Sequence, residues 1–425
     1  MSLRRFTTEQ WRKAGLGGSR LNLGADPQQL AAVREICAEV AVRGDEALFE
    51  YSRRFDGWAP SADEPLALRR DRLERALEGL PEADRWALEA AAERIRAFHE
   101  RQRYPDLTGP GGLRLLTRPV SRAGLYVPGG RAAYPSTVLM TAIPARVAGV
   151  REVVVATPPA ADGGVPTAIL AAAAIAGVDA VCRMGGAQAV AALAYGTASV
   201  PRVDVIAGPG NLYVTLAKRE VFGAVGVDSL AGPTEIMIVA DGRAPADYLA
   251  ADLASQLEHD PMTWAVLVTD SPGLADAVEE AFGDQLPDLD RADTIAAANC
   301  CVVLAGSMDE AMDVVNGFAP EHLEIVAEDA ERLLAQVENA GAVFLGQHTP
   351  VSLGDYVIGP NHTLPTGGSA RFSSPLGVYS FLKRTSVAEV TREELVELGG
   401  AARRLAELEG LTAHARAIEV RTRDE

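Results

Sequence analysis

The chain has 425 residues, of which 48% are hydrophobic, and its 58 acidic residues outnumber 40 basic ones for a formal net charge of −18. This length and hydrophobic content predict a globular protein with two or more domains and exclude a disordered chain. The acidic balance argues against nucleic acid or an anionic membrane as a partner, because both need a basic surface. The four cysteines form no CxxC pair and the first ten residues hold no apolar signal segment, so we expect a cytoplasmic protein.

The first part of the chain is predicted to be helical after an N-terminal arm of residues 1–25. Asp26 and Pro27 form a helix cap with proline at the first position, and the run to residue 55 has 3.6-residue periodicity. Residues 81–102 predict a second long helix.

Strands and helices alternate from residue 121 onward. In the first series, strands are predicted at 123–130, 151–159, 180–186 and 203–210, each followed by a helix. A second series begins after residue 234, with strands at 235–241, 263–270, 299–306, 322–328 and 342–346. Such βα alternation is typical of a parallel sheet with helices on both faces.

Two successive series of similar length predict an α/β fold with two duplicated doubly wound parallel-sheet domains, Rossmann-like but incomplete, with helical N-terminal and C-terminal extensions. We assign residues 26–120 plus 231–376 to the first domain and 121–230 to the second. Residues 347–376 are predicted to be a functional loop, since loops of that length are otherwise uncommon. The remainder, 377–425, is predicted to be a helical tail that docks on its own body or on a second subunit.

Three glycine-rich turns of the first series, at 126–130, 184–188 and 207–211, each precede a helix. The N-terminus of a helix suits a phosphate group, so these turns are candidate nucleotide contacts. None of them matches GxGxxG, and ordinary βα turns explain them equally well.

Several polar side chains in the second series and the tail could bind a metal ion or handle protons. Gln256 and His259 lie three residues apart near a helix end, which fits half a metal site or, more commonly, a capped helix. Two imidazoles, a carboxylate and an amide oxygen would suit Zn²⁺, but spacing alone does not select which groups supply them. The adjacent Glu321 and His322 fit a solvated loop as well as a catalytic pair.

Eight motifs, taken together in their order, resemble the histidinol dehydrogenase family from about residue 26 to the C-terminus. They are GLYVPGG, GGAQA, AGPGN, AGPTE, SQLEHD, APEHLEI, GDYVIGPNHTLPT and LTAH. The resemblance implies zinc-dependent oxidation of L-histidinol to L-histidine through the aldehyde with two NAD⁺, at the end of histidine biosynthesis. It also implies a homodimer in which each tail reaches the partner's site.

The residue roles that follow are those implied by the resemblance. The proton acceptors would be Glu321 and His322, and the ligands of one zinc per subunit would be Gln256, His259, Asp355 and His414. NAD contacts would be Tyr126, Gln188 and Asn211. The substrate would contact Thr234, Gln256, His259, His322, Asp355, His362, Glu409 and His414. One departure is Thr234, where the family usually has Ser; the hydroxyl is kept with a more restricted rotamer.

Three other functions fit parts of the pattern. A related zinc- and NAD-dependent dehydrogenase of another small polar alcohol, such as a sulfonated diol, would share most of these motifs. A zinc hydrolase could use Glu321 on a metal-bound water, and the absence of GxGxxG favours it slightly. A binding protein without catalysis would leave many ionisable groups without a role.

Overall fold

A computed structural model describes residues 3–15, 26–61, 64–129 and 133–422 and divides into two compact units. Unit 1 comprises Met1–Arg103 with Val120–Phe381, and unit 2 comprises Tyr104–Pro119 with Leu382–Glu425. Among the described helices, none combines the length and hydropathy that crossing a membrane requires.

The first sheet of unit 1 has the strand order β2-β7-β6-β5-β8-β9. Its strands are Ala67–Arg69 (β2), Arg122–Tyr126 (β5), Glu152–Thr157 (β6), Ala180–Arg183 (β7), Val205–Ala207 (β8) and Gly226–Val227 (β9). All neighbours are parallel except β2, which pairs antiparallel with β7. The helices that connect successive strands are Pro135–Ala148 (α6), Thr167–Ile175 (α7), Gly186–Tyr195 (α8) and Leu212–Val221 (α9).

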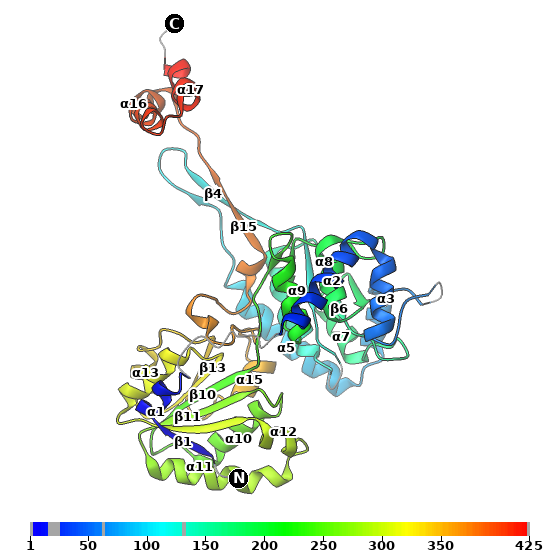
Figure 1. Ribbon diagram of the computed structural model, residues 1–425, viewed down its shortest axis with the longest axis vertical. Helices are drawn as coiled ribbons and strands as arrows, with labels where there is room; N and C mark the ends of the chain where they lie inside the picture. The colour runs from blue at the N-terminus through cyan, green and yellow to red at the C-terminus, as the bar shows by residue number, and fades with distance from the viewer. Residues whose placement is uncertain (1–2, 16–25, 62–63, 130–132, 423–425) are drawn as a thin grey trace. The chain divides into compact units, whose positions relative to one another are not determined.

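The second sheet has the order β1-β12-β11-β10-β13-β14 and is parallel throughout (Figure 1). Its strands are Arg4–Thr7 (β1), Glu235–Ala240 (β10), Trp264–Thr269 (β11), Asn299–Leu304 (β12), His322–Val326 (β13) and Ala342–Leu345 (β14). Its helices are Thr8–Lys13 (α1), Ala246–Leu257 (α10), Pro272–Gln285 (α11), Ala292–Ala297 (α12), Met308–Phe318 (α13) and Ala330–Leu334 (α14), with a short 3-10 turn at Leu286–Asp288. All six residues of β10 are buried, because apolar clusters pack against both faces of the sheet.

The two sheets repeat one topology. Numbered along each series, both read 3-2-1-4-5, and an additional edge strand from earlier in the chain lies beside strand 3. That is the dinucleotide-binding order without its sixth strand. The predicted fold class of duplicated doubly wound parallel sheets is therefore confirmed.

Two predicted groupings differ from the main packing contacts. The helices Pro27–Arg43 (α2), Asp45–Phe55 (α3), Arg70–Glu78 (α4) and Glu82–Glu100 (α5), which the prediction joined to residues 231–376, pack mainly on the helices of the first sheet. Their apolar faces pack on the first sheet's helices, and residues of α2 and α3 share one core with β6, β7 and α8. The N-terminal arm is also not a separate extension, because β1, dark blue in Figure 1, extends the second sheet.

The predicted loop 347–376 contains one short helix, Val351–Tyr356 (α15), and a 3-10 turn at Ser369–Arg371, and a second such turn at Val378–Phe381 ends unit 1. The side chain of Asn361 attaches this loop to the helices α5 and α6. It donates to the carbonyl of Met140 on α6 and contacts the buried His99 of α5.

Unit 2 is less helical than predicted. Strands Leu107–Thr108 (β3), Arg114–Pro119 (β4) and Leu382–Val387 (β15) form an antiparallel sheet in the order β15-β4-β3. The tail then forms two helices, Arg392–Leu408 (α16) and Thr412–Thr422 (α17), in place of the single predicted one. Gly410, with φ of 74°, allows the chain to reverse between them.

Candidate active site

The start of β13 brings two ionisable side chains together. Ala319 ends α13 with φ of 54°, the only positive φ of a non-glycine residue in the described parts of the chain. Pro320 and Glu321 follow this turn, and regular strand structure begins only at His322. Because Glu321 precedes the strand, its side chain does not have to point to the face opposite that of His322. Its carboxylate Oε2 lies 3.6 Å from Nδ1 of His322.

The Glu321 carboxylate accepts two hydrogen bonds at Oε2. Thr234 Oγ1 donates at 2.5 Å and the backbone N–H of Glu235 at 2.9 Å. Burial raises the pKa of Glu321 to about 7, against the opposing effects of His322 and of these hydrogen bonds. A buried carboxylate with a pKa near neutral can act as a general base, which is compatible with the role that the resemblance implies for this residue.

The ring of His322 is almost completely buried and is oriented by the backbone. Its Nδ1 lies 3.1 Å from the carbonyl of Glu235, which can only accept, so Nδ1 carries a hydrogen. Nε2 is buried without a hydrogen-bond partner among the described residues, and lies 3.7 Å from Oδ1 of Asp355. In the neutral tautomer Nε2 is thus an available proton acceptor.

The pKa of His322 differs from the ordinary value near 6.5 assumed from sequence. Burial by itself would lower this pKa, but the carboxylates of Glu321 and Asp355 outweigh burial and raise it to about 9. The two carboxylates therefore favour the protonated ring, so near neutral pH His322 has to release a proton before Nε2 can accept another.

Three imidazoles interact with one carboxylate next to this pair. His362 Nδ1 donates to the backbone carbonyl of Asp355 at 2.8 Å, and its Nε2 lies 3.4 Å from Thr137 Oγ1 on α6. Burial alone would raise the pKa of Asp355, but the hydrogen-bonding interaction with His322 and the charges of His322, His362 and His259 outweigh burial and lower it. This carboxylate therefore stays ionised and is suited to a cation.

Gln256 and His259 lie at the end of α10, close to the same group. The helix ends at Leu257, so His259 occupies the following turn, where its N–H donates to the carbonyl of Gln256. Gln256 Nε2 donates to Thr234 Oγ1, whose own hydrogen goes to Glu321. In this arrangement the amide nitrogen is used by Thr234, and Oε1 of Gln256, the amide atom that can bind a metal ion, takes no part in that bond.

The predicted zinc ligands thus fit a metal in their chemistry but do not form a closed cage. Among the described residues, no group of three or more His, Cys, Asp or Glu side chains lies close enough to hold an ion. Within the described residues, the unpartnered Nε2 of His322 nevertheless lies 3.7 Å from Oδ1 of Asp355. The zinc set stays a prediction.

Glu409 and His414 belong to unit 2. Glu409 caps the end of α16 and His414 lies in the first turn of α17, and both are exposed. Their predicted contact with zinc and substrate stays a prediction.

The predicted NAD residues follow the carboxyl ends of strands in the first sheet. Tyr126 ends β5 and its hydroxyl accepts from the N–H of Gly186 at 3.0 Å, while Gln188 donates to Asp56 at 3.3 Å. Asn211 follows β8 and caps α9 through Val214 N–H. β5 and β8 are neighbours at the point where strand order reverses, the usual ligand position of such sheets.

A buried ion pair supports the turn that precedes Asn211. Lys218 is 2% exposed and donates to the carbonyl of Gly208 at 3.0 Å and to Asp228, which in turn accepts from the N–H of Gly208 at 2.7 Å. Gly208 has φ of 111°, and a Cβ there would lie 2.2 Å from the carbonyl oxygen of Tyr126. The turn is therefore fixed on both sides and cannot accept a larger residue.

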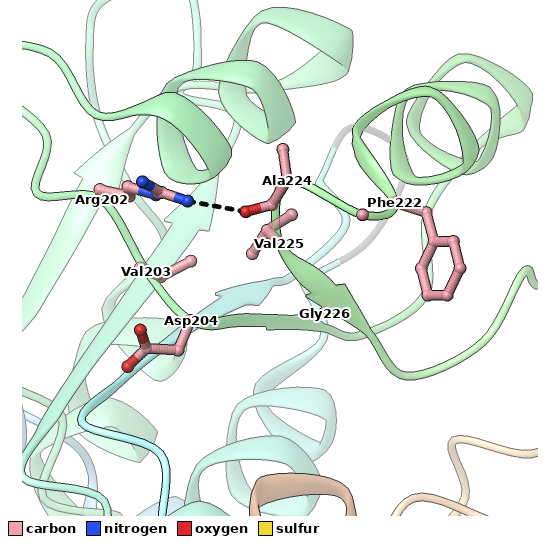
Figure 2. Close-up of a pocket in the computed structure, with 8 residues that line it drawn as sticks. Arg202, Val203, Asp204, Phe222, Ala224, Val225 and Gly226 are labelled. Atoms are coloured by element: carbon pink, nitrogen blue, oxygen red, sulfur yellow. Dashed lines mark hydrogen bonds between the residues drawn. The ribbon is translucent and has the colours of Figure 1, made fainter. Parts of the chain in front are cut away.

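A surface pocket of about 300 Å³ lies elsewhere, around Arg202, Asp204 and Phe222 (Figure 2). Asp204 precedes β8 and Gly226 begins β9, so the pocket borders the amino ends of these strands. Arg202 donates to the carbonyl of Ala224, and Asp204 accepts from two backbone N–H groups, so both charges have partners inside the protein. We assign no function to this pocket.

Comparison with known proteins decides the family. A family model described as histidinol dehydrogenase matches residues 22–422, and the histidinol dehydrogenase of Pseudomonas aeruginosa is 50% identical over 401 residues, covering 92% of this chain and 91% of that protein. The chain belongs to the histidinol dehydrogenase family. The enzyme of Parasynechococcus marenigrum is 49% identical over 399 residues, covering 92% of this chain and 89% of that protein. The crystal structure of histidinol dehydrogenase from Elizabethkingia anophelis has a TM-score of 0.92 and 31% identity, covering 99% of this chain and 98% of that one.

Membership in the histidinol dehydrogenase family confirms the predicted family and the prediction of a dehydrogenase. Several residues that organise the site were not predicted from sequence. Glu235 orients His322 through its carbonyl, Asp56 contacts the second glycine-rich turn, and the ion pair of Lys218 with Asp228 holds the third. The chain has only three lysines, and this scarcity was the one feature of the sequence that could have drawn attention to Lys218.

Proposed function

We propose that this protein oxidises L-histidinol to L-histidine through the aldehyde, transferring one hydride to each of two NAD⁺, as the final steps of histidine biosynthesis. The observation that carries this proposal is the adjacent pair of buried proton acceptors, Glu321 and His322, 3.6 Å apart in a chain of this family. Two oxidations at one carbon pose two proton-transfer problems, and the site contains two neighbouring bases.

His322 would accept the proton in the first oxidation. With the ring in its neutral form, which its raised pKa makes more abundant at alkaline pH, the hydroxyl proton moves to Nε2 as hydride leaves the alcohol carbon. The resulting imidazolium is stabilised by Glu321 and Asp355, and Nδ1 remains bonded to the carbonyl of Glu235. Positioned general bases of this kind contribute typically ~10²–10⁴-fold to rate.

Glu321 would serve the second oxidation. The aldehyde must add water before it can release another hydride, and the proton of that water needs an acceptor. Burial raises the pKa of Glu321 to about 7, which suits this task. Thr234 and the N–H of Glu235 both bind Oε2, so Oε1 is the oxygen free to take the proton.

Gln256, His259 and Asp355 of one subunit, with His414, would hold one zinc ion. Bound there, zinc would fix the imidazole and amino nitrogens of histidinol and orient its alcohol carbon. Thr234 keeps the amide of Gln256 turned so that Oε1 stays available. His362, held by Asp355 and Thr137, and Glu409 would add substrate contacts.

Tyr126, Gln188 and Asn211 would contact NAD⁺. The support for this assignment is their position at the carboxyl ends of β5, β7 and β8, with the first sheet reversing its strand order between β5 and β8. The contact of His362 with Thr137 on α6 connects the catalytic sheet with the helix that follows β5.

We further propose a cytoplasmic homodimer with exchanged tails. The helices α16 and α17 expose a group of large apolar side chains, namely Val396, Leu398, Leu405, Leu408, Leu411 and Val420. Such a group favours coverage by a protein surface. The four cysteines are buried free thiols, which suits a reducing compartment.

One assay tests the proposed activity. Purified protein, with zinc content measured, is given NAD⁺ and histidinol, histidinal or a sulfonated diol, and NADH absorbance is followed. Histidinol and histidinal should both yield NADH, with two NADH per histidinol converted. NADH from the diol alone would assign another dehydrogenase activity, and no NADH from any of these substrates would reject the proposal.

A further inference from the structure

A buried carboxyl group, Glu324, and a half-buried one, Asp252, lie next to each other close to His322. Glu324 is on β13 two residues after His322, on the same face of the sheet, and is 2% exposed. Asp252 lies on α10 one turn before Gln256, and its carboxyl group is within hydrogen-bonding reach of Glu324. Neither residue contacts the proposed reacting atoms in the described structure, so the reaction as proposed leaves both without a role.

Glu324 is attached to the short helix that carries Asp355. Its Oε1 accepts the backbone N–H of Val351, the first residue of α15, at 2.9 Å. The same helix packs on β14 at Gly354, where an added Cβ would lie 2.3 Å from the ring of Phe344. These two contacts fix α15, and Asp355 directly follows Gly354.

The second oxygen of Glu324 requires a proton in this neighbourhood. Oε2 is buried and receives no hydrogen bond from an N–H or hydroxyl group of the described residues. On the neighbouring strands the register partners of Glu324 are Ile238 and Phe344, which carry no charge. The charged groups that face it are Asp252 from α10 and His322 from its own strand. Two carboxylates in contact in such surroundings repel each other unless they share a proton.

We propose that Asp252 and Glu324 share one proton and together hold the start of α15, so that they act as positioning residues for Asp355 and, through it, for His322. Only the expected effect on catalysis rests on the proposed function; the shared proton and the attachment of α15 do not. The pKa values support it: burial raises the pKa of Asp252 to about 6, and burial together with the charge of Asp252 raises the pKa of Glu324 to about 8.

A pH-dependent stability follows from the shared proton. The folded protein keeps this proton up to about pH 8, whereas unfolded carboxyl groups lose theirs near their ordinary pKa values. Stability is therefore unaffected below the ordinary carboxyl range and falls as pH rises through it toward 8. Each unit of pH in this window should change the unfolding equilibrium constant by up to about tenfold.

Three variants separate the proposal from a general packing role. Glu324→Gln keeps an acceptor for Val351 and gives Asp252 a donor without needing the shared proton. Glu324→Ala removes the acceptor. Val351→Pro removes the donor, and proline is tolerated at the first position of a helix, although the buried valine side chain is replaced as well. Asp247→Asn, on the exposed side of α10, is the matched control.

Deuterium uptake of the segment 347–358, the urea midpoint between pH 5 and 8, and NADH formation from histidinol should be measured for each variant. We expect faster uptake and at least about tenfold lower kcat, with unchanged KM for NAD⁺, in Glu324→Ala and Val351→Pro. Glu324→Gln should match the wild type at pH 7 and lose the decline in stability with rising pH.

Unchanged uptake in Glu324→Ala and Val351→Pro would refute the role in holding α15. An equally steep pH decline in Glu324→Gln would refute the shared proton. If Glu324→Ala does not fold, Val351→Pro carries the test of the helix contact. Absence of histidinol oxidation in the wild type would remove the proposed function, while the uptake and stability measurements would still decide this inference.

Discussion

The Nδ1 atom of His322 lies 3.6 Å from the carboxylate of Glu321, although the two residues are adjacent in the chain. Regular strand structure would point them to opposite faces. The left-handed turn at Ala319 and the late start of β13 remove that constraint. Two proton acceptors therefore face one site without a second loop to bring them together.

Replacing His322 with alanine should lower the turnover of histidinol by at least ~10²-fold, because Nε2 would no longer accept the alcohol proton. Zinc content should remain that of the wild type, since His322 is not among the proposed ligands. Steady-state NADH formation and elemental analysis measure the two quantities. Wild-type turnover would exclude His322 from the mechanism.

The variant Glu321→Gln should slow the oxidation of histidinal more than that of histidinol. The amide retains hydrogen-bonding capacity toward Thr234 and Glu235 but cannot take a proton from water. Separate assays that start from each substrate measure the two steps. If the alcohol step failed while the aldehyde step persisted, the roles of the two bases would have to be exchanged.

His259→Ala should reduce the zinc bound per subunit, because it removes one of four proposed ligands. His348 offers a matched control, since it is an exposed histidine in the loop after β14 and lies outside the proposed set. We expect His348→Ala to retain its zinc. A full metal complement in His259→Ala, measured by elemental analysis after dialysis, would contradict the proposed site.

Tail exchange can be tested by mixing two inactive variants, His322→Ala and His414→Ala. In a mixed dimer with exchanged tails, the chain that keeps His322 receives the intact His414 of its partner. Random reassociation should then restore roughly a quarter of wild-type activity, since half of the dimers are mixed and each has one complete site. Zero recovery, with dimers verified by mass, would indicate that each tail serves its own chain.

Lys218→Met should destabilise the protein by ~3–5 kcal/mol, because it leaves the carboxylate of Asp228 buried without its cation. The turn at Gly208 would also loosen, so the KM for NAD⁺ should rise. Urea unfolding and initial rates measure both effects, with the neighbouring exposed Arg219→Met as control. A stable variant with wild-type KM would remove this ion pair from the support of the turn.

Periodicity predicted the two sheet series well because β10, β11 and β12 are continuous apolar runs bounded by turns. It failed for β1, whose residues RRFT are mostly polar and exposed at the edge of the sheet. It also failed for the placement of α2 to α5, because an amphipathic helix does not specify which sheet it will cover.

The site shows the same division between local signal and distant contact. The motif resemblance supplied Glu321, His322 and Asp355, yet the hydrogen-bonded chain from Gln256 through Thr234 to Glu321 joins residues up to 87 positions apart. The pairing of Asp252 with Glu324 left no trace in the local pattern, since each residue alone looks like an ordinary polar position in its element.

The pairing of Arg4–Thr7 with residues 301–304 has a consequence for biosynthesis. Strand β1 can pair with its neighbour only after residues 301–304 of the 425 have been translated, which is more than two thirds of the sequence. Until then β1 has no strand partner in the second sheet. Because this pairing closes a large loop, completion of the sheet is a late step of folding, and the nascent chain has to stay soluble with β1 unpaired until that step.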